Sequence, residues 1–115
     1  MTLSSDIQRL IERLNQELDN IEREATEKLP QANRLLSRFP GNARLTQLLA
    51  TLNNTILFIN TSRRFIQMTV EELAPDDVTS EEVQEAGEEL STLEGRIIEI
   101  KTLVSSTISA LERLQ

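Results

Sequence analysis

Residues 42–73 read NARLTQLLATLNNTILFINTSRRFIQMTVEEL, and this stretch decides the fold. Apolar residues recur in it at intervals of three and four, as they do along one face of an α-helix, and only Arg63 interrupts the series. The series is Leu45, Leu49, Leu52, Ile56, Ile59, Ile66, Val70 and Leu73. The spacing therefore predicts one long helix over 42–73 with this face buried.

The opposite side of the predicted helix is apolar as well. At 100° per residue, Leu57, Phe58, Phe65 and Met68 lie away from the first face. A helix with two apolar faces needs neighbours on both of them. We expect these residues to form an interface in a homo-oligomer, with a dimer favoured. The alternatives are that the second face is covered within one chain or by a different protein.

The segment before this helix carries a heptad seam, with apolar residues spaced alternately by four and three. Its positions are Ile7, Ile11, Leu14, Leu18, Ile21 and Ala25, followed after Pro30 by Ala32, Leu35 and Phe39. Ser5 and Gln8 are expected to cap the start of the helix. Because the seam keeps its phase across Pro30, we predict a helix over about 5–38 that is kinked near Pro30; a break at this proline is the alternative.

The last segment has the most regular seam, with every step three or four residues long. Its positions are Val83, Ala86, Leu90, Leu93, Ile97, Ile100, Val104, Thr107, Leu111 and Leu114. Thr79 with Glu82 forms a second capping box, so the predicted helix runs over about 80–114.

Short links separate the three predicted helices. The turn at 39–42 contains Gly41, which is free to adopt a positive φ, and Asn42, which is well suited to cap the helix that follows. Pro75 ends that helix. Because links this short join antiparallel neighbours, the sequence predicts an all-α, single-domain, elongated antiparallel three-helix bundle with coiled-coil-like packing.

The composition excludes several classes of chemistry. The 115-residue chain has no Cys, His, Trp or Tyr, so it lacks thiolate nucleophiles, disulfides, the commonest general base and the commonest zinc ligands. The sequence contains no glycine-rich phosphate loop and no calcium-loop pattern. We therefore expect a non-enzymatic protein without a metal or cofactor.

The charge distribution limits the partners. The net charge is -7, and the excess lies in residues 76–115. No cluster of Lys and Arg exists that would attract a phosphate backbone, so nucleic-acid binding is not expected. Residues 45–62 are uncharged, but half of them are Thr, Gln, Asn or Ser, which argues against membrane insertion. A basic segment followed by an apolar run is not found near Met1, so a cytoplasmic location is expected.

Two further features of the third helix could carry function. Gly87, Ser91 and Gly95 form a row of small residues that suits close helix packing, unless the glycines are simply tolerated. The start of the helix and the link before it are acidic, which favours either solubility or the docking of a basic partner. The acidic residues are Asp76, Asp77, Glu81, Glu82, Glu85, Glu88 and Glu89.

Arg63 occupies a core position of the middle helix. In the predicted hairpins it lies opposite about residue 18 and about residue 91. Its expected partners are therefore Glu17, Glu22, Glu89 and Glu94. The alternative is a side chain whose stem covers the seam while its guanidinium stays in water.

Together these features predict a helical protein–protein interaction or assembly module that self-associates through the helix over 42–73. The alternative is a small acidic regulatory protein that binds a basic surface of a partner through the start of the third helix.

Overall fold

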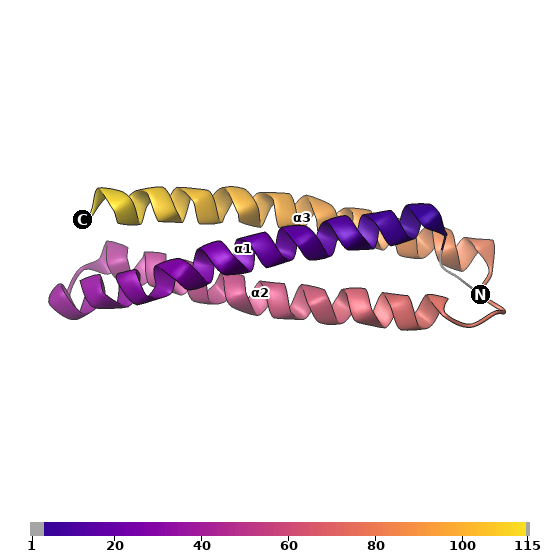
Figure 1. Cartoon of the computed structure of the whole chain (residues 1–115). Helices are drawn as coiled ribbons and strands as arrows, with labels where there is room; N and C mark the ends of the chain where they lie inside the picture. The colour runs from indigo at the N-terminus through magenta and orange to yellow at the C-terminus, as the bar shows by residue number, and fades with distance from the viewer. Residues whose placement is uncertain (1–3, 115) are drawn as a thin grey trace.

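The computed structural model describes residues 4–114. Within this range the chain forms three α-helices and no strand: α1 (Ser5–Arg38), α2 (Ala43–Leu73) and α3 (Ser80–Arg113). Each helix contacts the other two, and the bundle measures 58 × 18 × 17 Å (Figure 1). The predicted elongated antiparallel three-helix bundle is confirmed, and the helix bounds agree with the predicted ones to within one residue.

The helices begin at side-chain caps. The cap of α1 is Ser4, whose hydroxyl accepts a hydrogen bond from the Ile7 amide at 3.3 Å, so the prediction of Ser5 was wrong by one residue. Asn42 accepts from the Leu45 amide at 3.0 Å, and Thr79 accepts from the Glu82 amide at 3.1 Å, as predicted. Each cap satisfies an amide that has no partner inside its helix.

Pro30 lies inside α1, which continues without a break to Arg38. A proline removes one amide and crowds the carbonyl four residues earlier, here that of Thr26. Both residues are exposed, so water can solvate that carbonyl while the buried side of the helix stays intact. Ala32 and Leu35 are buried beyond the proline, so the seam keeps its phase as far as Leu35. Phe39, the last residue of the predicted seam, is 52% exposed, so that part of the prediction was wrong.

The turn between α1 and α2 is closed by a hydrogen bond from the Asn42 amide to the Phe39 carbonyl, at 3.0 Å. Gly41 does not use its freedom to adopt a positive φ. This turn reaches α2 through the cap at Asn42, with no left-handed residue.

The buried seam of α2 differs from the predicted one. Its positions are Leu45, Leu48, Leu52, Thr55, Ile59, Ser62, Ile66, Thr69 and Leu73. Leu49, Ile56, Arg63 and Val70 are only half-buried beside it. Because α2 faces two neighbours, its most buried line points between them, and hydroxyl residues can occupy it by donating to the carbonyl one turn earlier, as Thr55 does at 2.8 Å.

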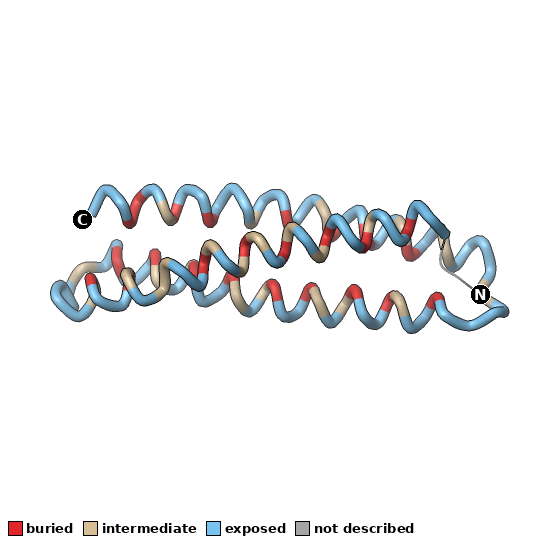
Figure 2. The backbone as a smooth tube through the Cα atoms, in the orientation of Figure 1, coloured by how far each residue is buried: buried red, intermediate tan, exposed pale blue. Residues whose placement is uncertain are grey.

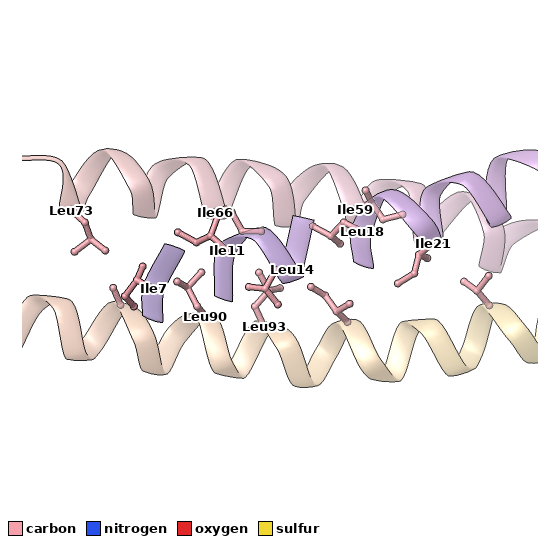
Figure 3. Close-up of a cluster of buried hydrophobic side chains, with 13 residues drawn as sticks. Ile7, Ile11, Leu14, Leu18, Ile21, Ile59, Ile66, Leu73, Leu90 and Leu93 are labelled. Carbon is pink, nitrogen blue, oxygen red and sulfur yellow. The ribbon is translucent and has the colours of Figure 1, made fainter. Parts of the chain in front are cut away.

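The core consists of two apolar clusters along the bundle. The larger one is built on Leu14, Leu18, Ile59, Leu90 and other aliphatic residues of all three helices (Figure 3). The other surrounds Leu45, Leu52 and Leu111 near the turn at Gly41. Buried positions recur as a line along the inner side of each helix (Figure 2), as in coiled-coil packing.

Ion pairs confirm the register of α1 against α3. Arg13 pairs with Glu94 at 2.7 Å, and Glu17 pairs with Lys101 at 3.2 Å. The sequence separations are 81 and 84 residues, nearly constant, as expected for parallel first and third helices in an up-down-up bundle.

Candidate interaction surface on α2 and α3

The predicted interface residues divide into two pairs. Leu57 and Met68 are 63% and 56% exposed and lie on the outer face of α2. Phe58 and Phe65 are half-buried and pack against the larger core cluster. The difference follows from helix geometry, because each phenylalanine lies 60–100° around α2 from the two exposed residues, toward α3.

A hollow of about 390 Å³ separates the two phenylalanines. It is lined by Phe58, Thr61, Ser62 and Phe65 of α2 and by Glu89, Thr92, Leu93 and Arg96 of α3. Ser62 occupies a buried seam position, where a leucine would extend into this space. The hollow therefore exists because a small side chain occupies the α2 seam between two large ones.

The sequence pattern did not single out Ser62, Thr92, Leu93 and Arg96 as surface-forming residues. The signal that could have found them is the second seven-residue series in α2, which runs through Leu48, Thr55, Ser62 and Thr69 and is small or polar after its first member. A seam of this kind packs against its neighbour less fully than a leucine seam.

A second hollow of about 330 Å³ adjoins the first at Glu89. It is lined by Glu72, Leu73, Glu82, Glu85, Ala86 and Glu89. In the described part of the chain, none of its four carboxylates forms an ion pair. One end of the α2–α3 surface is therefore strongly negative.

The predicted acidic patch is solvent-exposed throughout. Glu81, Glu82, Glu85, Glu88 and Glu89 all lie on the surface of α3. Among residues 4–114, no group of three or more carboxylates has the arrangement needed to hold a metal ion. The acids at the start of α3 lie where they interact favourably with the helix dipole.

The small residues of α3 do not lie together against a neighbouring helix. A Cβ built at Gly87 would lie 3.4 Å from the Ile7 side chain, which is an ordinary contact, whereas one built at Gly95 has nothing within 4 Å. Ser91 is exposed. Within one chain, only Gly87 of this row therefore approaches another helix.

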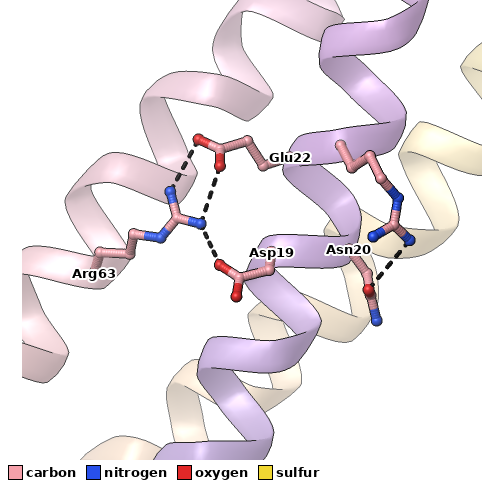
Figure 4. A network of polar contacts seen from close by, with 5 residues as sticks. Asp19, Asn20, Glu22 and Arg63 are labelled. Atoms are coloured by element: carbon pink, nitrogen blue, oxygen red, sulfur yellow. Dashed lines mark hydrogen bonds and ion pairs between the residues drawn. The ribbon is translucent and has the colours of Figure 1, made fainter.

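Arg63 pairs with α1, as the register of the predicted hairpin required (Figure 4). Its guanidinium donates to both oxygens of Glu22, at 2.9 and 3.1 Å, and also to Asp19. The hydrogen bonds that Arg63 donates to Glu22 raise the pKa of Arg63 above its ordinary value, against partial burial, and Asp19 raises it further. Glu22 was among the predicted partners; Asp19 was not, although it lies on the same face of α1, one turn away.

Another exposed apolar residue lies outside this surface. Ile98 is 59% exposed and is placed about 140° around α3 from Leu93, which lines the first hollow. It therefore provides a comparison residue on a different face.

No helix in the described range is both long enough and apolar enough to cross a membrane. When the chain is compared with protein-family models, with curated proteins and with solved structures, nothing matches.

Proposed function

We propose that this chain is a non-enzymatic helical interaction module that associates with a further helix, preferably one of a second copy, through the outer face of α2. The observation that carries the proposal is the exposure of Leu57 and Met68, three turns apart on that face. Neither residue belongs to the core clusters or packs against them, so the bundle does not use them for its own stability.

The adjoining phenylalanines extend this apolar surface toward α3. Phe58 and Phe65 are fixed by the core on one side and border the hollow on the other. A partner helix laid along α2 would contact the exposed residues and the edges of both rings. This is the arrangement by which amphipathic helices bind to grooves.

The expected strength is modest. Full burial of a large apolar side chain contributes roughly 1.5–3 kcal/mol. Scaled by the exposed fractions of Leu57 and Met68, two copies would gain about 4–7 kcal/mol before the phenylalanine edges are included. Association costs about 4–15 kcal/mol, so these two side chains alone leave a net gain of at most about 3 kcal/mol. With the phenylalanine edges included, we expect weak self-association, with a dissociation constant of about 1 mM or higher.

Sedimentation equilibrium tests the proposal, with protein from about 10 µM to about 1 mM so that the upper end approaches the expected dissociation constant. The apparent mass should rise above 13.1 kDa at the upper end. Leu57→Gln combined with Met68→Gln should abolish the rise, whereas Ile98→Gln, a matched change on another face, should not. A mass that stays monomeric throughout would refute self-association.

A second candidate function, the binding of a basic partner, is favoured by the four unpaired carboxylates of the second hollow. The two candidates respond to salt in opposite ways. Two copies with a net charge of -7 each repel one another, so salt should strengthen self-association. Binding of a basic peptide would weaken as salt rises.

A further inference from the structure

We propose that the groove between α2 and α3 binds a basic amphipathic helix of another protein. The groove consists of the two hollows described above, which share Glu89 in their linings. This inference rests on the second candidate function, the binding of a basic partner, and names the form of that partner and the way it lies on the chain. It does not depend on self-association through the outer face of α2.

The two walls of the groove have the spacing of helix-to-helix contacts. On α2 the lining residues Phe58, Phe65 and Glu72 follow one another at intervals of seven residues. On α3 the intervals are three and four residues, through Glu82, Glu85, Glu89, Thr92 and Arg96. Residues at these intervals face a partner helix along a coiled coil. Each line is about 21 Å long, which corresponds to about four turns of a helix and exceeds the reach of a small ligand.

The first hollow is the place for an apolar side chain of the partner. It has a volume of about 390 Å³ and lies between the rings of Phe58 and Phe65. Ser62, which lines it, is 3% exposed, and its hydroxyl has no hydrogen-bond partner in the described range, whereas Thr55 and Thr69 of the same seam donate to backbone carbonyls. Buried hydroxyls are usually bonded, so this one indicates a site that is completed from outside the chain.

The charges along the groove select a basic partner. Within residues 4–114, none of the four carboxylates that line the second hollow forms an ion pair. Residues 65–95 contain ten acidic residues and no basic one, so the neighbouring sequence supplies no cation to pair with them. Lysine or arginine residues that flank the apolar face of a partner helix would pair with these carboxylates, as residues at the edges of coiled coils do. A second copy, with a net charge of -7, is not favoured in this groove.

Arg96 gives the groove a direction. Because α2 and α3 are antiparallel, Arg96 lies at the Phe58 end of the first hollow, about 10 Å along α3 from Glu89 (Figure 1). Arg96 has no ion-pair partner in the part of the chain that the structure describes. A basic residue of the partner is disfavoured at this end and an acidic one is favoured, so the basic end of the partner helix lies over the second hollow.

A synthetic peptide of about 18 residues, long enough to span the groove, tests the inference. It carries leucines at intervals of three and four, lysines that flank the leucines over one half, and one glutamate at the opposite end. A scrambled peptide of the same composition is its control. Titration of the fluorescently labelled peptides with protein up to about 1 mM, in about 20 mM salt, should raise the anisotropy of the patterned peptide and affect the scrambled one at least about tenfold more weakly.

Filling the hollow from within tests the apolar half of the site. Ser62→Leu should raise the dissociation constant of the patterned peptide at least about tenfold, because its side chain occupies the space that a leucine of the peptide enters. Thr55→Leu is the matched change one heptad earlier in the seam, outside both hollows, and should have no such effect. Circular dichroism confirms that each variant is folded. If Ser62→Leu does not fold, the comparison with the scrambled peptide decides.

Removal of carboxylates tests the charged half. Glu72→Gln combined with Glu85→Gln should weaken binding about three- to tenfold. Glu12→Gln combined with Glu27→Gln removes two exposed carboxylates from α1, which does not line the groove, and should change binding less than twofold. Equal effects of the two pairs would show that only the net charge matters and would overturn the inference.

The direction of the partner has its own test. Arg96→Gln should weaken binding of the patterned peptide about two- to fivefold and should not weaken binding of a peptide in which the glutamate is replaced by glutamine. The same loss with both peptides would refute this direction.

The remaining outcomes separate the inference from the function on which it rests. Binding of both peptides with equal affinity, or unchanged binding by folded Ser62→Leu, would leave an acidic surface that attracts basic peptides and would overturn the groove as the site. Binding of neither peptide would refute the second candidate function as well. Self-association is measured without peptide, so its result is independent of all these outcomes.

Discussion

Gly95→Ala should stabilise the monomer. Gly95 lies in the interior of α3, is exposed, and has no atom within 4 Å of the position that a Cβ would take. Glycine inside a helix is about 0.5–1 kcal/mol less favourable than alanine, because the unfolded chain gains more conformational freedom. With no contact to oppose it, this whole difference should appear as added stability.

The size of the effect can be stated as a melting temperature. The entropy of unfolding is about 2.1 cal/mol/K per residue, or about 0.24 kcal/mol/K for a chain of this length. A gain of 0.5–1 kcal/mol therefore corresponds to a rise of about 2–4 °C. Thermal unfolding followed by circular dichroism at low protein concentration, where the chain is monomeric, measures this shift.

Gly87→Ala is the matched comparison, since both glycines lie inside α3 and only Gly87 approaches another helix. Its new methyl group would lie 3.4 Å from the flexible end of the Ile7 side chain, so a gain no larger than that of Gly95→Ala is expected. A Gly95→Ala variant with a lowered melting temperature would refute the reasoning. A variant that is more stable but self-associates less would place the small residues of α3 in the contact between copies.

Two further predictions concern α1 and its contact with α2. A double-mutant cycle with Arg63→Met and Glu22→Gln should give a coupling free energy of about 0.5–1.5 kcal/mol in urea unfolding, because the pair is bidentate but one-third exposed; a coupling of zero would mean that water screens it fully. Because the pKa of Arg63 is raised, the stability that its charge contributes is fully present below the pKa of an unfolded arginine and is lost only as pH rises through the higher pKa of the folded state. The coupling free energy that depends on this charge should therefore be the same at about pH 6 and pH 9. Pro30→Ala restores an amide to the exposed side of α1 and should stabilise the protein by about 1–3 kcal/mol in the same assay; destabilisation would show that the core depends on the backbone geometry that the proline favours.

The sequence specified the helices almost completely. Periodicity located three amphipathic segments, and capping residues such as Asn42 and Thr79 placed two of the helix starts. The register followed from the link lengths, which is why Glu22 could be named as a partner of Arg63. These features are local or depend on a short link, so a pattern along the chain contains the information.

The details that required tertiary structure depend on how each helix is rotated about its own axis relative to its neighbours. The series that includes Leu49 and the series that includes Leu48 are both compatible with a helix, and only packing against α1 and α3 together selected the second as buried. That choice placed Ser62 inside the bundle, opened the hollow beside it, and turned Phe58 and Phe65 partly inward while Leu57 and Met68 stayed exposed. Sequence periodicity determines that a helix has an apolar face, but the angle at which that face is divided between two neighbours is fixed only when all three helices pack.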